Sequence, residues 1–119
     1  MIEIERKFLV KNNSFLSDFS RKYKITQGYL NSDPNRAVRV RIRDKKGFLT
    51  VKGKGNATGM SRFEWEKEIS IEEAEQLLLL CEPGIIDKTR YIIPYQNQKF
   101  EVDVFEGENQ GLIIAEIEL

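Results

Sequence analysis

Apolar and polar residues alternate with a period of two through most of this 119-residue chain. The plainest example is the segment 36–43, where Val38, Val40 and Ile42 alternate with arginines. Successive side chains of a β-strand point to opposite faces, so this alternation predicts strands that each have one apolar and one polar face. About eight strands are predicted, at residues 2–10, 23–30, 36–43, 48–54, 62–69, 85–95, 99–105 and 112–119.

Two helices are predicted between these strands. A short one covers residues 15–21, and a longer one begins at Ser70, where Glu73 three positions later completes a capping box. The longer helix is expected to end at Pro83-Gly84. Most connections are short turns, apart from a glycine-rich loop at 53–59, whose glycines lack the spacing of a phosphate-binding P-loop. The fold class is therefore mainly β (α+β): an eight-stranded antiparallel barrel or tunnel with a few helices packed outside.

Charged side chains gather on the face of each predicted strand that lies opposite the aliphatic residues. Acids and bases are clustered strand by strand rather than mixed. The acids are Glu3, Glu5, Glu64, Glu66, Asp103, Glu116 and Glu118, and the bases are Lys7, Arg39, Arg41, Arg43, Lys52, Lys54, Lys88 and Arg90.

Two interpretations of this charged face are open. A sheet with one solvated face would carry cross-strand ion pairs that contribute little each. Repeated Glu-x-Glu is unusual on such a face, however, and Arg-x-Arg with Glu-x-Glu matches a phosphate chain and its metal ions. Guanidinium groups bind phosphate oxygens bidentately, and carboxylates bind Mg²⁺. A sheet that closes with these charges inward would form a polar tunnel. Phe63, Trp65 and Phe105 are interpreted as packing residues rather than as base-stacking platforms.

Composition narrows the chemistry further. The 19 basic and 19 acidic side chains cancel, which argues against binding nucleic acid through bulk positive charge. The absence of histidine excludes His-based metal sites and catalytic triads, and the single cysteine, Cys81, excludes an intrachain disulfide and Cys-rich zinc sites. A hard-cation site would therefore consist of carboxylates, which suits Mg²⁺ or Mn²⁺. No export signal or membrane span is visible, so a cytoplasmic location is expected and no membrane partner.

An ordered set of motifs resembles a known family. Glu3-Ile4-Glu5-Arg6-Lys7 is similar to the E-x-E-x-K signature of the CYTH superfamily, the triphosphate tunnel metalloenzymes. Further matches follow in the order of that family, at Arg39-x-Arg41, Lys52, Arg62 with Glu64-x-Glu66, Lys88-x-Arg90, Asp103 and Glu116-x-Glu118. The segment 25–30 is most similar to the short bacterial members, several of which hydrolyse inorganic tripolyphosphate. The resemblance covers residues 1–119 as a single tunnel domain that lacks the usual C-terminal tail of the family.

The resemblance implies a role for each matched residue. The residues expected to bind the triphosphate are Lys7, Arg39, Arg41, Lys52, Lys88 and Arg90. The residues expected to hold Mg²⁺ or Mn²⁺ are Glu3, Glu5, Asp103, Glu116 and Glu118. The catalytic set is expected to be Glu64, Glu66, Arg41 and Lys7, with Glu64 or Glu66 positioning and deprotonating the attacking water.

The expected activity is divalent-metal-dependent hydrolysis of a triphosphate, either inorganic tripolyphosphate or a nucleoside triphosphate. A class IV-type adenylate cyclase that makes cyclic AMP is one alternative, because such enzymes share the tunnel. A non-catalytic module that binds polyphosphate or nucleotide is the other. The expected partner is a small-molecule triphosphate, and a homodimer is left open.

Overall fold

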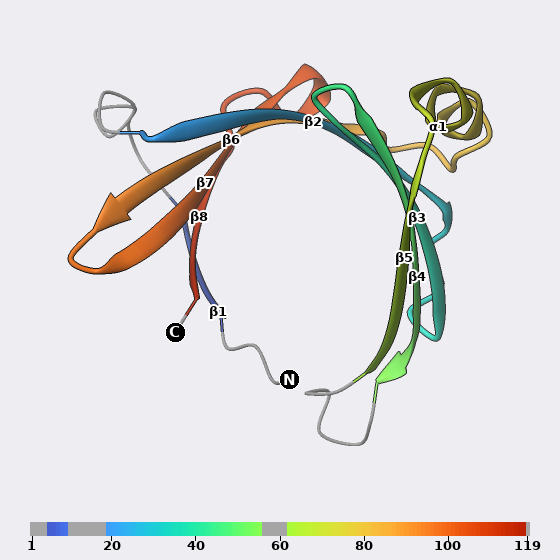
Figure 1. The fold of residues 1–119 in the computed structure, drawn as a ribbon, viewed down its shortest axis with the longest axis horizontal. Helices are drawn as coiled ribbons and strands as arrows, with labels where there is room; N and C mark the ends of the chain where they lie inside the picture. Colours follow the sequence, from blue (N-terminus) through green and yellow to red (C-terminus); the bar gives the residue numbers. More distant parts are fainter. Residues whose placement is uncertain (1–4, 10–18, 56–61, 119) are drawn as a thin grey trace. The chain divides into compact units, whose positions relative to one another are not determined.

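The computed structural model describes residues 5–9, 19–55 and 62–118, which fall into two compact units. The terminal unit comprises Met1–Lys24 and Ile86–Leu119, and the central unit comprises Ile25–Ile85. Strand β2 (Arg21–Asn31) begins in the terminal unit and continues in the central one (Figure 1). Every strand pairing for which a register is given is antiparallel, so the prediction of a mainly antiparallel β fold is confirmed.

The terminal unit contains four hydrogen-bonded strands in the order β1-β8-β7-β6. Their bounds are β1 Glu5–Leu9, β6 Ile86–Tyr95, β7 Gln98–Glu106 and β8 Ile113–Glu118, and a 3-10 turn, η2, covers Gly107–Asn109. Gln96 and Asn97 join β6 to β7 with φ of 48° and 64°, values that Asn tolerates better than most residues. Ile93, Val102, Ile113 and Ala115 form the buried core, to which alternate residues of three neighbouring strands contribute.

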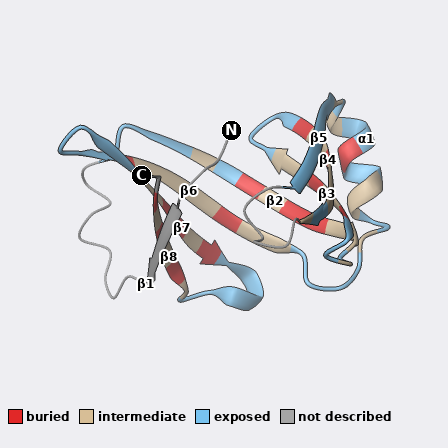
Figure 2. Cartoon of the chain, turned by 90° about the horizontal axis from the view of Figure 1, so that it is seen from below, coloured by how far each residue is buried: buried red, intermediate tan, exposed pale blue. Residues whose placement is uncertain are grey.

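The central unit contains strands in the order β2-β3-β4-β5, and one α-helix. Their bounds are β3 Arg36–Arg43, β4 Lys46–Gly55, β5 Arg62–Ile69 and α1 Ile71–Leu78. Burial does not follow a strict period of two along these strands: the buried residues are Ala37 and Val40 on β3 and Gly47 and Thr50 on β4, three positions apart in each case. Figure 2 colours the chain by burial. Among the residues whose burial the structure describes, Ile25, Val40 and Thr50 are the largest side chains that are fully buried.

Helix α1 begins as the sequence predicts and covers one end of the central sheet. Ser70 accepts a hydrogen bond from the Glu73 backbone N–H at 3.0 Å, and the Glu73 carboxylate accepts one from the Ser70 N–H at 3.1 Å. These bonds satisfy donors that have no partner within the helix. Ala74 is completely buried and packs against Gly47 of β4. A Cβ added to Gly47 would lie only 2.6 Å from the Ala74 Cβ. The close approach of helix and sheet therefore requires a glycine at residue 47.

Replacing Gly47 with alanine is expected to lower the free energy of unfolding by about 1–3 kcal/mol, because the new methyl group would force helix and strand apart. The backbone oxygen of Ser70, 3.0 Å from the added Cβ, cannot swing away as a side chain would. Urea denaturation measures the effect. Gly53→Ala on the same strand is the matched control, since its added Cβ meets nothing closer than 3.4 Å. Equal stability of the two variants would contradict this packing argument.

Several sequence predictions need correction. The glycine-rich loop was predicted to begin at residue 53, but strand β4 continues to Gly55. The helix at 71 ends at Leu78 rather than beside Pro83. The helix predicted at 15–21 lies largely outside the described residues, and its last residue, Arg21, already belongs to β2.

The aromatic residues divide between two environments. Phe105 is 9% exposed, as expected of a packing residue. Phe63 and Trp65 on β5 are 66% and 42% exposed, so for these two residues the prediction was wrong. They lie toward the end of the central sheet away from Gly47 and α1, since the register pairs Gly47 with Ile69 and Val51 with Trp65. Within the described part of the chain, no helix is long and apolar enough to cross a membrane.

Candidate active site

The strand register brings several charged residues of the central unit onto one face. Directly paired residues of antiparallel strands share a face, and the pairs run in rows across the sheet. One row contains Tyr29, Arg39, Thr50 and Glu66, and the next contains Gln27, Arg41, Phe48 and Glu68. A third row contains Ala37, Lys52 and Glu64. We call Arg39, Arg41, Thr50, Lys52, Glu64 and Glu66 the central charged face.

Thr50 lies between an arginine and a glutamate on this face. Its hydroxyl donates a hydrogen bond of 2.8 Å to Glu66 Oε2 and accepts a longer one of 3.5 Å from Arg39 Nη2. Thr50 is 1% exposed, whereas Glu66 is exposed, so a buried side chain holds an accessible carboxylate. Arg39 Nε is buried and, among the described residues, is the one such side-chain nitrogen or oxygen without a hydrogen-bond partner. A buried donor left unpaired costs about 1–3 kcal/mol, and a rotation of the guanidinium toward an anionic ligand would remove that cost.

Arg41 is held by a second polar residue. Its Nε donates a hydrogen bond of 3.0 Å to Gln27 Oε1, and Gln27 is 7% exposed. Gln27 lies on β2 and pairs with Arg41 in the register, so the amide and the guanidinium lie side by side. Both arginines of the Arg39-x-Arg41 motif therefore have polar neighbours that limit their orientation.

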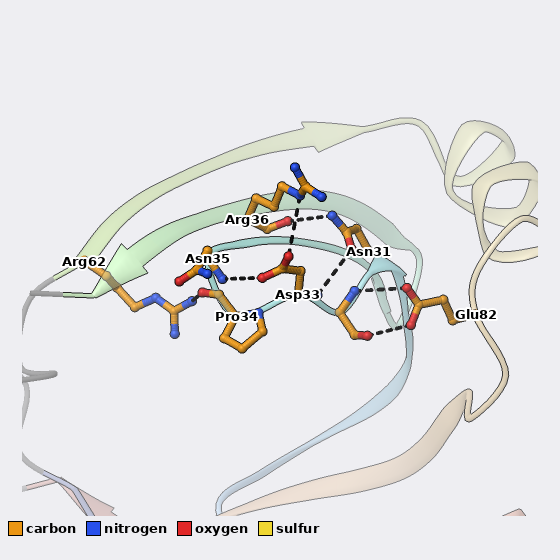
Figure 3. Close-up of polar contacts among 8 residues, drawn as sticks. Asn31, Asp33, Pro34, Asn35, Arg36, Arg62 and Glu82 are labelled. Carbon is orange, nitrogen blue, oxygen red and sulfur yellow. Dashed lines mark hydrogen bonds and ion pairs between the residues drawn. The ribbon is translucent and has the colours of Figure 1, made fainter.

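Arg62, which also belongs to the matched motifs, has a different environment. Its Nη2 donates to the Pro34 backbone oxygen at 3.1 Å (Figure 3). Its Nε donates to the Gly53 backbone oxygen at 3.2 Å. Gly53 directly follows Lys52 at a register irregularity between β4 and β5. The guanidinium thus ties the start of β5 to the end of β4 and to the turn that joins β2 and β3.

That turn has its own polar network, drawn in Figure 3. Asp33 accepts a hydrogen bond of 2.9 Å from the Asn35 N–H, and Asn31 accepts one of 3.2 Å from the Asp33 N–H. Glu82 accepts two hydrogen bonds from Ser32, from its backbone N–H at 3.1 Å and its hydroxyl at 2.6 Å. The bonds of Asn31 and Asp33 are local and replace the strand ladder where the chain reverses, whereas those of Glu82 come from a distant part of the chain. Together they fix the entry into β3, which carries Arg39 and Arg41.

The terminal unit has a charged cluster of its own, centred on Asp103. Arg90 binds this carboxylate bidentately, with Nε–Oδ1 at 2.8 Å and Nη2–Oδ2 at 3.0 Å, and Lys88 Nζ lies 2.8 Å from Oδ2. The side chains of Asp103 and Lys88 are only 5% and 9% exposed. Arg90 Nη1 also lies 3.3 Å from Glu101 Oε2. We call Lys88, Arg90, Glu101, Asp103 and Glu116 the terminal charged cluster.

The ion pairs of this cluster determine which groups are ionised. Burial by itself would raise the pKa of Asp103, but the hydrogen bonds and positive charges of Arg90 and Lys88 outweigh it and lower the pKa. Burial likewise opposes the charge of Arg90, yet Asp103, with Glu101 and Glu116, raises its pKa. The carboxylate therefore stays ionised and orients two of the predicted phosphate-binding side chains. The resemblance assigns Asp103 to metal binding. In the structure its carboxylate contacts two positively charged side chains, those of Lys88 and Arg90.

The remaining predicted metal ligands are placed only by the backbone register, or not at all. The register pairs Glu101 with Glu116, Glu116 with Lys7, and Glu118 with Glu5. Glu3 lies outside the described residues. Within the described part of the chain, no three acidic or sulfur-bearing side chains lie close enough together to hold a metal ion.

Three residues of these sites were not singled out by the sequence analysis. Thr50 lies two positions before Lys52, and Glu101 two positions before Asp103, so the period-two rule places each on the same face as its charged neighbour. Gln27 is a polar position within an otherwise apolar part of β2. The positions of these three residues along their strands were visible in the sequence. The side chains that they contact depend on the cross-strand register, which was not.

Comparisons with known proteins show what this chain is similar to. The family model described as the CYTH domain matches residues 1–119. The chain is 47% identical to the inorganic triphosphatase of Acetivibrio thermocellus over 118 residues, which cover 98% of this chain and 74% of that protein. It is 37% identical to the inorganic triphosphatase of Nitrosomonas europaea over 122 residues, covering 99% of this chain and 76% of that protein. This chain belongs to the CYTH domain family.

The fold comparison supports the same assignment. A crystal structure of an inorganic triphosphatase matches with a TM-score of 0.74 at 31% identity, covering all of this chain and 74% of that one. The match confirms that the alternating strands form a CYTH fold. This CYTH chain thus spans about three quarters of the length of the relatives it matches.

Proposed function

We propose that this protein hydrolyses a triphosphate, with inorganic tripolyphosphate as the favoured substrate. The observation that carries the proposal is the buried Arg39 Nε, a donor without an acceptor among the described residues, beside the accessible Glu66. Membership of the CYTH family and the names of its two triphosphatase relatives support the same substrate class. Resemblance to adenylate cyclases is the weaker alternative, because the two curated relatives, at 47% and 37% identity, are both named inorganic triphosphatases.

In the central unit, we assign phosphate binding to Arg39, Arg41 and Lys52. Their side chains come from adjacent strands on one face, so they can contact several oxygens of one phosphate chain. Charge that spreads over the transferred phosphoryl group in the transition state would be stabilised by the two guanidinium groups. Neither arginine needs to reorganise far, because Thr50 and Gln27 already limit their orientation.

Glu66, with Glu64 as its neighbour on β5, is assigned to the attacking water. Its Oε2 is engaged by Thr50, so Oε1 is the oxygen available to accept a proton from water. The water oxygen would form the new bond to the terminal phosphorus while the bridging P–O bond breaks. Pyrophosphate would leave with that electron pair, and orthophosphate would be the second product.

In the terminal unit, we assign phosphate binding to Lys88 and Arg90, with Lys7 on β1. Asp103 is assigned the role of holding the first two of these cations, rather than a metal ion, because their three ion-pair contacts are all 2.8–3.0 Å. This reassignment departs from the role that the family resemblance implies for Asp103.

A divalent cation is the cofactor we propose, and Mg²⁺ or Mn²⁺ fits the available donors. The register places Glu5 opposite Glu118 on neighbouring strands, where like charges destabilise a sheet unless a cation compensates them. Glu3, Glu5, Glu116 and Glu118 would hold the ion, which would supply charge neutralisation at phosphate oxygens and a more acidic bound water.

The proposal is tested with a panel of tripolyphosphate, ATP and thiamine triphosphate, with Mg²⁺, with Mn²⁺ and with EDTA. We expect orthophosphate and pyrophosphate from tripolyphosphate, only when a divalent metal is present. Cyclic AMP and pyrophosphate from ATP would instead identify a cyclase. Binding of tripolyphosphate without any turnover would overturn the proposed hydrolysis and leave a binding module.

A further inference from the structure

We propose that Thr50 is a positioning residue that sets the orientation of Glu66 and Arg39 for triphosphate hydrolysis. The inference rests on the function proposed above and extends it to a residue that does not itself bind phosphate or metal. Thr50 is 1% exposed, so its hydroxyl is not available to a ligand in the way that an exposed side chain would be. Its effect must therefore pass through the groups that it contacts.

The geometry gives the hydroxyl a defined direction. A threonine hydroxyl has one donor hydrogen and can also accept. The short bond of 2.8 Å to Glu66 Oε2 uses that hydrogen, and the lone pairs then remain for the Arg39 Nη2 donor at 3.5 Å. A hydrogen bond to an ionised carboxylate is stronger than one between neutral groups, so the bond to Glu66 should be the more important of the two.

The register explains why this position can serve such a role. Thr50 is the direct cross-strand partner of Arg39 on one side and of Glu66 on the other. A β-branched side chain has few accessible χ1 rotamers, and burial between two neighbouring strands restricts it further. A rigid hydroxyl can therefore limit the rotation of an exposed glutamate, whose side chain would otherwise sample several rotamers.

Thr50→Val tests this inference because it removes the hydroxyl and keeps the branched shape, while Thr50→Ser keeps the hydroxyl. We expect Thr50→Val to lower kcat for tripolyphosphate by about 10- to 100-fold, the range that loss of such supporting hydrogen bonds typically causes. Its dissociation constant for tripolyphosphate, measured by calorimetry, should rise by a smaller factor through Arg39. Thr50→Ser should restore most of both properties.

Thr89→Val is the matched control, because Thr89 also donates a hydrogen bond to a glutamate, Glu106, at 3.0 Å, but at an exposed pair outside both charged groups of residues. It should leave kcat unchanged. In a Glu66→Gln background, Thr50→Val should reduce kcat much less than it does in the wild-type protein, since two groups that act as one unit are not additive. Thermal melting by circular dichroism establishes that each variant is folded.

The outcomes separate this inference from the proposed function. If the wild-type protein releases phosphate and Thr50→Val does so equally well, the Thr50 inference is wrong and the function stands. Equal losses in Thr50→Val and Thr50→Ser would indicate packing alone and would also overturn it. If the wild-type protein binds tripolyphosphate without hydrolysing it, the proposed hydrolysis is wrong. The Thr50 inference is then tested by binding alone: weaker binding in Thr50→Val but not in Thr50→Ser supports it, and any other result overturns it. A wild-type protein that neither binds nor hydrolyses tripolyphosphate overturns both.

Discussion

Replacing Arg39 with alanine is expected to lower kcat/KM for tripolyphosphate by about 10²- to 10³-fold, the loss typical of removing one preorganised charge-stabilising donor. The physical reason is that the guanidinium has a buried Nε without an acceptor among the described residues, so turning it toward a ligand oxygen gains a hydrogen bond without first removing water from the donor. Steady-state phosphate release at several substrate concentrations measures the effect on kcat and on KM.

Two further variants make the Arg39 experiment specific. Arg39→Lys keeps the positive charge but loses the planar fork, so it should recover only part of the activity. Arg36→Ala is the matched control: Arg36 begins the same strand, its side chain is 78% exposed, and it pairs with Asp33 at 3.7 Å. Activity of Arg36→Ala should stay near the wild-type value. Similar losses in Arg36→Ala and Arg39→Ala would show that strand β3, rather than the Arg39 guanidinium, is what the reaction requires.

Replacing Asp103 with asparagine is expected to lower the free energy of unfolding by about 3–5 kcal/mol, because it leaves Lys88 and Arg90 without their central buried counter-charge. Such a loss is a large part of the stability of a typical domain. Urea denaturation followed by circular dichroism provides the measurement. Glu101→Gln is the control, since that side chain is 45% exposed and contacts Arg90 at 3.3 Å, so its loss should cost about 1 kcal/mol or less.

The same cluster predicts how stability depends on pH. Because the pKa of Asp103 is lower in the folded protein than in the unfolded chain, the unfolded chain takes up protons first as the pH falls. The contribution of Asp103 is therefore fully present above the ordinary aspartate pKa of about 3.9 and is lost as the pH falls through the folded-state pKa. Asp103→Asn should weaken this acid dependence. An unchanged acid transition in Asp103→Asn would contradict the role assigned to the ion pairs.

Local sequence patterns were enough to predict most strands, the start of helix α1 and the candidate site residues. The period-two alternation at 36–43 and the capping box at Ser70 depend on residues close together in the chain, and both were confirmed within a few residues. The ordered motifs from Glu3-x-Glu5-x-Lys7 to Glu116-x-Glu118 indicated the family by resemblance, which the match over residues 1–119 confirmed. Which members of these motifs bind phosphate or metal stays a prediction.

The sequence by itself therefore determined the mainly β class and the charged faces, because both depend on spacing along a strand. Its ordered motifs also indicated the CYTH family, by resemblance to that family. Only the tertiary structure decided which side chains the charged residues contact. Only the cross-strand register places Thr50 between Arg39 and Glu66. Only the pairing of β6 with β7 brings Asp103 into contact with Lys88 and Arg90, which its position in the sequence did not predict. The same is true of the 42% exposure of Trp65, which the alternation along β5 did not predict. Alternation assigns a side chain to a face, but contacts between strands far apart in the chain assign its neighbours.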